Sequence, residues 1–242
     1  MKKILKRVLI GLGVLVALLG IAAAYVYFTA FANNRPIVDR QRVVPGVEVV
    51  KDGFVSVDIL DAGPDKVALV DCGNDKKAEA TLAALSERKM SADSVVAIFL
   101  THGHSDHTNG CRMFPKAEVY AMDDEVSRIG DAAKVSVRLK DGDVEQVGDL
   151  RVEAFATPGH TKGSAVFLAN GALFFGDSAG AAKDGSMMPA VRLFSEDPAQ
   201  NMASLKALEG RLAPRADEIK ALVFAHSGPL DGFAPFATFA SK

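Results

Sequence analysis

The 242-residue sequence predicts an α/β fold of two sheets with helices outside, preceded by an N-terminal transmembrane helix. Three observations support this prediction. Apolar runs of strand length recur along the chain, and turn residues such as Gly, Pro, Asn and Asp separate them. Residues 76–89 have the pattern of an amphipathic helix. An uncharged stretch of 25 residues, Val8–Ala32, follows four basic residues at the N-terminus.

The N-terminal stretch predicts a membrane anchor, because about 20 apolar residues suffice to cross a hydrocarbon core. A cleaved signal peptide is the alternative, since Ala30-Phe31-Ala32 resembles a small-x-small cleavage site. The basic flank places the N-terminus in the cytoplasm and the rest of the chain on the extracytoplasmic, periplasmic side; cleavage would make the protein secreted. We expect an anchor or signal segment over residues 1–34 and one folded domain over residues 35–242.

The amino-acid composition predicts a folded core and argues against a nucleic-acid partner. A hydrophobic content of 49% is enough for a sizeable core, and the formal net charge is −2. Nucleic-acid-binding domains carry a basic surface that this chain lacks, so we expect no nucleic-acid partner.

The first half of the folded domain follows a polar linker, Asn33–Arg42. It predicts a strand pair on either side of a turn at Lys51–Gly53, a buried strand, an amphipathic helix and a second buried strand. These segments are Val47–Val50, Phe54–Leu60, Val67–Val70, Lys76–Lys89 and Val95–Leu100.

The second half predicts helices at Asn109–Phe114, Asp123–Ile129 and Pro198–Leu212. Strands are expected at Glu118–Ala121, Val135–Leu139, Val144–Val147 and Leu150–Ala156, in a hairpin at Phe167–Phe175, and at Ala221–Ala225, the last buried strand. Residues 179–197 show no periodicity and are expected to form a long loop. Such loops are often functional, so this one is either a substrate-facing wall or a solvated connector.

The segment Thr101–His107 contains a cluster of candidate metal ligands. Three of the five histidines of the chain, His102, His104 and His107, fall here together with Asp106. The segment directly follows a predicted strand, and alternate side chains of an extended segment point the same way. Imidazole and carboxylate together suit zinc, iron or manganese.

The spacing His-x-His-x-Asp-His resembles the signature of the metallo-β-lactamase superfamily of hydrolases. The later residues His160, Asp177 and His226 each follow an apolar run, in the order of that family. The resemblance covers roughly Pro45–Pro229. It implies a four-layer αβ/βα sandwich and a metal-dependent enzyme.

By this resemblance, His102, His104 and His160 would hold one zinc ion. Asp106, His107 and His226 would hold the second, with Asp177 bridging. The expected cofactor is therefore two Zn²⁺ per chain, with iron or manganese as alternatives. A zinc-bound hydroxide would attack the substrate, and Asp106 would be the catalytic acid and base. Some β-lactam hydrolases of the superfamily carry Asp-Ser here without a bridging carboxylate, so Asp177-Ser178 is compatible with either arrangement.

Asp71 lies in Asp71-Cys72-Gly73, which matches an Asp-x-Gly of the family whose carboxylate lies behind the metal loop. The resemblance implies that Asp71 orients the ligand loop. A turn residue at a strand end is the alternative.

The resemblance implies hydrolysis of a small molecule that contains an ester, thioester, lactone or amide. Gly176-Asp177 resembles thioesterases of the glyoxalase II type, but only 16 residues follow His226 where those enzymes have a helical domain. Homoserine lactonases carry a Tyr after the bridging Asp, and here no Tyr follows Tyr120. A periplasmic β-lactamase fits the location. The substrate is unassigned.

Two other functions remain open. Persulfide dioxygenases share the His-x-His-x-Asp-His motif but bind one iron, so a mononuclear-iron oxidoreductase is one alternative. A non-catalytic, membrane-tethered metal-binding module is the other.

The two cysteines, Cys72 and Cys111, are expected to be ordinary buried thiols. Export would allow a disulfide, but nothing in the sequence indicates that their Cα atoms come close enough.

Overall fold

A computed structural model describes residues 2–242 and divides the chain into two compact units, Met1–Asn33 and Asn34–Lys242. The first unit is one helix, α1 (Lys2–Phe31). Within it, Ile4–Phe28 spans 25 residues with a mean hydropathy of 2.5. By length and composition this helix can cross a membrane, and a signal sequence has the same character.

The second unit contains two main sheets, as the sequence predicts. The seven-stranded sheet has the spatial order β1 (Gln41–Val44), β2 (Val47–Asp52), β3 (Val55–Asp61), β4 (Val67–Val70), β5 (Val95–Phe99), β6 (Glu118–Met122) and β7 (Val137–Leu139). The six-stranded sheet has the order β15 (Ser227–Asp231), β14 (Ala221–Phe224), β11 (Ala172–Phe174), β10 (Ala165–Ala169), β9 (Leu150–Ala156) and β8 (Val144–Val147).

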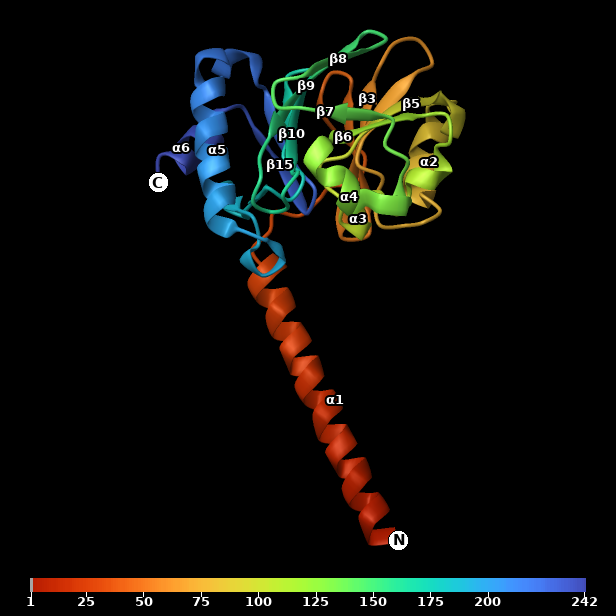
Figure 1. The fold of residues 1–242 in the computed structure, drawn as a ribbon, viewed down its shortest axis with the longest axis vertical. Coiled ribbons are helices and arrows are strands. Elements are labelled where there is room, and N and C mark those ends of the chain that lie inside the picture. Colours follow the sequence, from red (N-terminus) through yellow and green to blue (C-terminus); the bar gives the residue numbers. More distant parts are fainter. Residues whose placement is uncertain (1) are drawn as a thin grey trace. The chain divides into compact units, whose positions relative to one another are not determined.

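Helices cover the outer face of each sheet (Figure 1). The seven-stranded sheet is covered by α2 (Glu79–Glu87), α3 (Ser105–Thr108) and α4 (Val126–Ile129). The six-stranded sheet is covered by α5 (Pro198–Leu212) and α6 (Ala234–Ala240). Single 3₁₀ turns lie at 92–94, 111–113, 123–125, 130–132 and 192–194, and a longer one at 213–218. The layers are therefore helix, sheet, sheet, helix, which confirms the predicted sandwich.

Three apolar clusters hold these layers together. The middle cluster lies between the sheets and includes Phe99, Phe167 and Phe174, while two outer clusters lie under the helices. Because side chains alternate along a strand, buried strands contribute to an inner and an outer cluster at once. In β5, Phe99 belongs to the middle cluster and Ile98 to the outer one. This explains why the strands are continuously apolar in sequence.

The strand directions bring the predicted ligand loops to one region. Strands β4, β5 and β6 are parallel, and so are β11 and β14. Side chains that follow the carboxyl ends of parallel strands meet at the same edge of a sheet, where α/β proteins commonly bind ligands. The loops after β5, β11 and β14 carry the predicted ligands.

Several predicted elements differ from the observed ones. The helix predicted over Lys76–Lys89 is shorter, because the Asp75 carboxylate accepts bonds from the N–H groups of Lys77 and Glu79 and forms a turn before α2. The 109–114 and 123–129 segments contain 3₁₀ turns, with a single α-helical turn at Val126–Ile129. Strand β1 lies partly within the predicted linker.

Two segments were assigned wrongly. Part of the predicted loop 179–197 is a hairpin of β12 (Ala179–Ala181) and β13 (Met187–Pro189). Strands of three residues are too short to show periodicity in sequence. The prediction that 221–225 is the last strand is also wrong, because β15 and α6 follow it. Strand β15 contains Gly228 and Pro229, which conceal it in sequence.

The expectation of two free thiols is wrong. Cys72 and Cys111 form a disulfide, with their Cα atoms 5.0 Å apart. They meet because the Cys72 N–H donates to the His107 carbonyl over 2.7 Å, which brings the end of β4 against α3. The bond therefore joins two segments that carry candidate site residues.

Candidate metal centre

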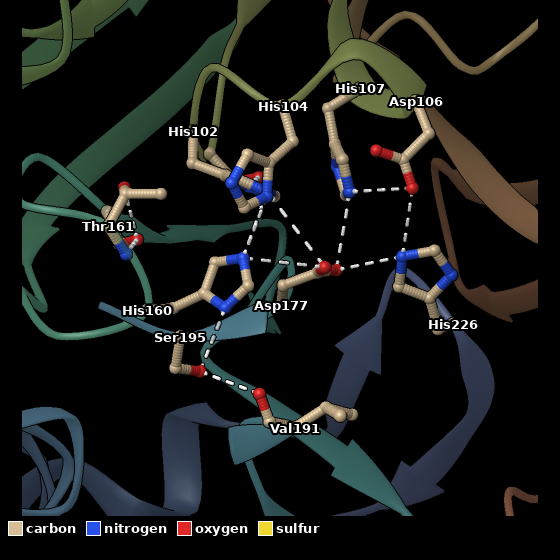
Figure 2. A network of polar contacts seen from close by, with 12 residues as sticks. His102, His104, Asp106, His107, His160, Thr161, Asp177, Val191, Ser195 and His226 are labelled. Carbon is tan, nitrogen blue, oxygen red and sulfur yellow. Dashed lines mark hydrogen bonds and ion pairs between the residues drawn. The ribbon is translucent and has the colours of Figure 1, made fainter. Parts of the chain in front are cut away.

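The loop after β5 is anchored by Asp71. The Thr101 N–H and hydroxyl donate to the two oxygens of the Asp71 carboxylate over 2.8 and 2.7 Å. His102 and His104 then follow with one residue between them, and α3 begins at Ser105, so that Asp106 and His107 lie in its first turn. The change from extended chain to helix turns all four candidate ligands toward one region (Figure 2).

The structure brings all seven predicted ligands together, in two groups (Figure 2). Within each group, one nitrogen or carboxylate oxygen of every residue lies within 4.8 Å of the others. The first group is His102, His104, His160 and Asp177; the second is Asp106, His107 and His226.

In the first group, three imidazole nitrogens face one another. His160 Nε2 lies 3.2 Å from His102 Nε2 and 3.1 Å from His104 Nδ1, and the latter two nitrogens are 3.0 Å apart. Asp177 Oδ2 lies 3.6 Å from His160 Nε2. These atoms surround a single point.

In the second group, His226 Nε2 lies 3.3 Å from Asp106 Oδ2 and 3.2 Å from Asp177 Oδ1. His107 Nε2 lies 3.3 Å from the same Asp177 oxygen. Asp177 therefore lies between the groups, with one carboxylate oxygen toward each.

This arrangement fits divalent metal ions. His107 Nε2 and Asp177 Oδ1 are buried and lie 3.3 Å apart, yet neither makes a hydrogen bond of acceptable geometry. Buried polar atoms in proteins nearly always have partners, and a bound ion is one recognised explanation for an exception. Imidazole lone pairs that face one another also repel unless a proton or a cation lies between them. Three His and one Asp around one point are ordinary zinc ligands.

Burial keeps the first group unprotonated. It lowers the pKa of His102 well below its usual value, and it lowers the pKa of His160 to about 4. Burial also lowers the pKa of His104. At neutral pH these imidazoles are neutral, which is the form that binds metal.

In the second group, by contrast, neighbouring carboxylates raise the pKa values of the histidines. Burial favours the neutral carboxyl of Asp177, but His226 and His107 outweigh it and hold the pKa of Asp177 well below its usual range. Against the effect of burial, Asp177 and Asp106 raise the pKa of His226 to about 10. Asp177 and Asp71 raise the pKa of His107. Without a metal ion, these shifts favour the protonated forms of His226 and His107, so positive charge is favoured where a cation would be held.

Four of the five histidines use their other ring nitrogen for a second contact. His102 Nδ1 lies 3.1 Å from Thr101 Oγ1, and His107 Nδ1 lies 2.7 Å from Asp71 Oδ2. His160 Nδ1 lies 3.2 Å from Ser195 Oγ (Figure 2), and His226 Nδ1 lies 3.0 Å from the carbonyl oxygen of Phe54. Such contacts orient metal-binding histidines in proteins.

Asp71 occupies the position that the resemblance implies, behind the ligand loop. It is 2% exposed and has φ 59°, a left-handed conformation that is uncommon outside glycine. Its neighbour Asp58 is wholly buried, and desolvation, together with Asp71, raises the pKa of Asp58 well above its usual range. Burial and the nearby Asp71 charge therefore favour the neutral form of the Asp58 carboxyl.

Glu125 was missed by the sequence analysis. It is 1% exposed, and its Oε1 accepts the Gly103 N–H over 2.8 Å. Its Oε2 accepts the Thr161 hydroxyl over 2.9 Å and the Gly163 N–H over 2.8 Å. One buried carboxylate thus connects the loop of His102 and His104 to the loop of His160. The sequence predicts a helix at Asp123–Ile129, which contains Glu125, but it gives no signal that this carboxylate contacts the ligand loops.

Residues 50–226 match the family described as the metallo-beta-lactamase superfamily. A hydroxyacylglutathione hydrolase from Cronobacter sakazakii is 34% identical over 166 residues, which are 67% of this chain and 59% of that protein. One from Gloeothece citriformis is 36% identical over 132 residues, 50% of this chain and 48% of that protein. The match spans about half to three-fifths of these relatives.

Solved structures share the fold. A B3 metallo-beta-lactamase with an active-site glutamic acid has a TM-score of 0.64 at 20% identity, over 87% of this chain and 89% of that one. A subclass B3 metallo-beta-lactamase of Bradyrhizobium japonicum has a TM-score of 0.62 at 17% identity, over 86% and 92%. At such identities the likeness concerns the fold alone.

Proposed function

The chain belongs to the metallo-beta-lactamase superfamily, and from that premise we propose that this metallo-hydrolase uses two zinc ions to cleave an ester, thioester, lactone or amide. The observation that carries the proposal is the position of Asp177, whose two oxygens face the two groups of ligands. A single-metal site would leave the second group of Asp106, His107 and His226 unexplained.

In the proposed site, His102, His104 and His160 would hold one ion and Asp106, His107 and His226 the other, and Asp177 would be a ligand of both. Metal ions bound there would lower the pKa of water and polarise a carbonyl oxygen. Buried neutral imidazoles give the first group its ligand form without deprotonation.

Asp106 is the proposed proton carrier. Burial raises its pKa, but the hydrogen bond with His226 and the charges of His107 and His226 together outweigh burial and hold the pKa below the usual value. Asp106 is therefore ionised at neutral pH and accepts the proton of the attacking water. When the carbonyl carbon releases its leaving group, Asp106 returns that proton to the departing sulfur, oxygen or nitrogen.

Among these bonds we favour a thioester, because the curated relatives are named hydroxyacylglutathione hydrolases.

We also propose that the catalytic unit is held on the extracytoplasmic side by α1. The basic residues before the apolar stretch support this orientation. The Cys72–Cys111 disulfide supports it independently, since disulfides persist mainly in oxidising compartments.

The test is the metal content of the purified full chain, measured per mole of protein beside thioester hydrolysis. We expect about two zinc ions per chain, and His160→Ala should lose metal and activity together. Asp106→Asn keeps an oxygen ligand but no strong proton acceptor, so it should retain metal and lose activity by about 100-fold or more.

Other outcomes would change the assignment. About one iron per chain would favour the sulfur-oxidising alternative. Full activity in Asp106→Asn would contradict the proposed proton carrier. A wild-type chain that binds two metal ions and hydrolyses none of these bonds would favour the non-catalytic module.

A further inference from the structure

Several exposed apolar side chains lie on segments that contact the candidate site. Within residues 34–242, all of which the structure describes, the large hydrophobic side chains with the greatest exposure are Val38 (58%), Phe54 (56%), Val144 (47%), Leu193 (65%) and Phe194 (43%). Single exposed hydrophobic residues are ordinary on protein surfaces. Here, however, four of the five, Val38, Phe54, Leu193 and Phe194, lie on three segments that contact candidate ligands.

Phe54 lies against the second ligand group. Its ring stacks on the imidazole of His226, with centroids 5.7 Å apart and an interplanar angle of 6°. Its carbonyl oxygen lies 3.0 Å from His226 Nδ1. The turn between β2 and β3 therefore holds an exposed aromatic ring beside a proposed metal ligand.

Leu193 lies near the first ligand group. It belongs to the 3₁₀ turn Arg192–Phe194, and the next residue, Ser195, lies 3.2 Å from His160 Nδ1 through its hydroxyl. The Glu196 N–H donates to the His160 carbonyl over 3.0 Å. The segment that carries the exposed Leu193 is thus attached to the His160 loop, as the turn that carries Phe54 is attached to His226.

The connection to α1 is also attached to the site. Asn34 Nδ2 donates to the His226 carbonyl over 2.9 Å, and the Arg35 N–H donates to the Ala181 carbonyl over 2.8 Å. Only Ala32 and Asn33 separate Asn34 from Phe31, the last residue of α1. Covalent reach alone limits the Phe31 and Asn34 Cα atoms to about 11 Å, at roughly 3.6 Å per residue.

We propose that the substrate is an amphipathic acyl thioester taken from a bilayer surface, with its apolar chain against Phe54 and Leu193 and its carbonyl at the ligand groups. This inference rests on the proposed hydrolytic function and specifies the substrate of that same site. The short connection limits how far Asn34, and the His226 carbonyl that it binds, can lie from the end of α1. Amphipathic acyl chains accumulate at the lipid surface that a membrane-spanning helix would cross. A small polar substrate would gain nothing from exposed phenyl and isobutyl groups.

The test uses the full chain, loaded with zinc, in phosphatidylcholine vesicles. Acyl thioesters of one common thiol, from acetyl to octanoyl, are compared by kcat/KM. We expect kcat/KM to rise about twofold per added methylene, since partial burial of each group gives part of the free energy of its full transfer.

The variants compare the octanoyl-to-acetyl ratio of kcat/KM. Leu193→Ser and Phe54→Ser should each lower this ratio about fivefold or more. Val144→Ser is the matched control, because Val144 is similarly exposed but lies on β8, and it should leave the ratio unchanged. Partition of each thioester into vesicles is the same for every variant, so differences between variants report on the protein.

Two failures can be told apart. Turnover without dependence on chain length, or an equal ratio in Leu193→Ser and Val144→Ser, overturns this inference and leaves the hydrolase intact. No turnover of any thioester by the metal-loaded chain overturns the proposed thioesterase together with the inference.

Discussion

At the scale of single residues, the candidate ligands are held by contacts that come from distant parts of the chain. Asp71, Ser195 and Phe54 each contact a histidine through the nitrogen that faces away from the ligand group. Glu125 holds the backbone of two ligand loops at once. In metalloproteins, loss of one such contact typically costs 10–100-fold in metal affinity or activity.

Glu125→Gln should therefore weaken zinc binding about 10-fold, and Glu125→Ala more strongly. The amide of Gln replaces one acceptor oxygen with an N–H₂ group, which cannot accept from Gly103 or from Thr161 and Gly163. Competition with a chelator measures the affinity. Glu79→Gln, at an exposed position of α2, is the control. Lower stability of the metal-free protein with unchanged zinc affinity would contradict a positioning role.

Zinc affinity should also depend on pH. The pKa of His226 is about 10 and that of His107 is raised, so both are protonated in the metal-free protein at pH 7. An ion that binds the second group must displace these protons, and its affinity rises with pH by about tenfold per unit for each proton released. The first group differs, because His160, with a pKa of about 4, is already neutral.

Calorimetry between pH 6 and 8, in buffers of different ionisation enthalpy, gives the number of protons released for each ion bound. We expect one ion to bind with little proton release and the other to release at least one proton. Equal, pH-independent binding of both ions would contradict the assignment of protons to the second group.

At the scale of elements, the disulfide fastens β4 to the segment after α3. It closes a loop with a sequence separation of 39 residues, which contains α2, β5 and the first four candidate ligands. A cross-link over a loop of this length lowers the entropy of the unfolded chain, which corresponds to about 4 kcal/mol in the chain-entropy treatment.

The double variant Cys72→Ser/Cys111→Ser should therefore lower the unfolding midpoint by about 10 °C, at a few degrees per kcal/mol for a domain of this size. Thermal unfolding followed by circular dichroism measures the shift. Reduction of the wild-type protein should reproduce it, whereas the variant itself should be insensitive to reductant. A wild-type midpoint that does not change on reduction would show that the bond contributes little.

At the scale of the whole molecule, all three apolar clusters lie between Ile37 and Phe239. We expect a chain that starts at residue 33 to be soluble, to fold and to bind metal, because it retains every core residue and the bond from Asn34 to His226. Solubility, circular dichroism and zinc content test this.

A chain that starts at residue 40 provides the comparison. It loses the bond from Asn34 to the His226 carbonyl and the bond from Arg35 to the Ala181 carbonyl. Because His226 belongs to the second ligand group, the second metal ion should bind more weakly. If the chain from residue 33 precipitates unfolded, α1 is part of the fold and the predicted boundary is wrong.

Local pattern was sufficient for the fold class and for the set of candidate ligands. Continuous apolar runs indicated the buried strands, because a strand between two layers needs hydrophobic side chains on both faces. The ligands of the first loop lie within six residues, and the others directly follow strands. Both signals are local, so the sequence displays them.

The remaining features depend on contacts that leave no local pattern. Glu125 reaches partners 22 to 38 residues away, and Asn34 reaches His226 across 192 residues. Two cysteines in the sequence are equally compatible with free thiols and with a disulfide, until the packing of β4 against α3 brings them together. Short strands such as β12 form because a partner lies beside them. Composition and spacing thus suffice for the family and for the set of candidate ligands, because both signals are local, whereas tertiary packing decides which residues hold those ligands in place.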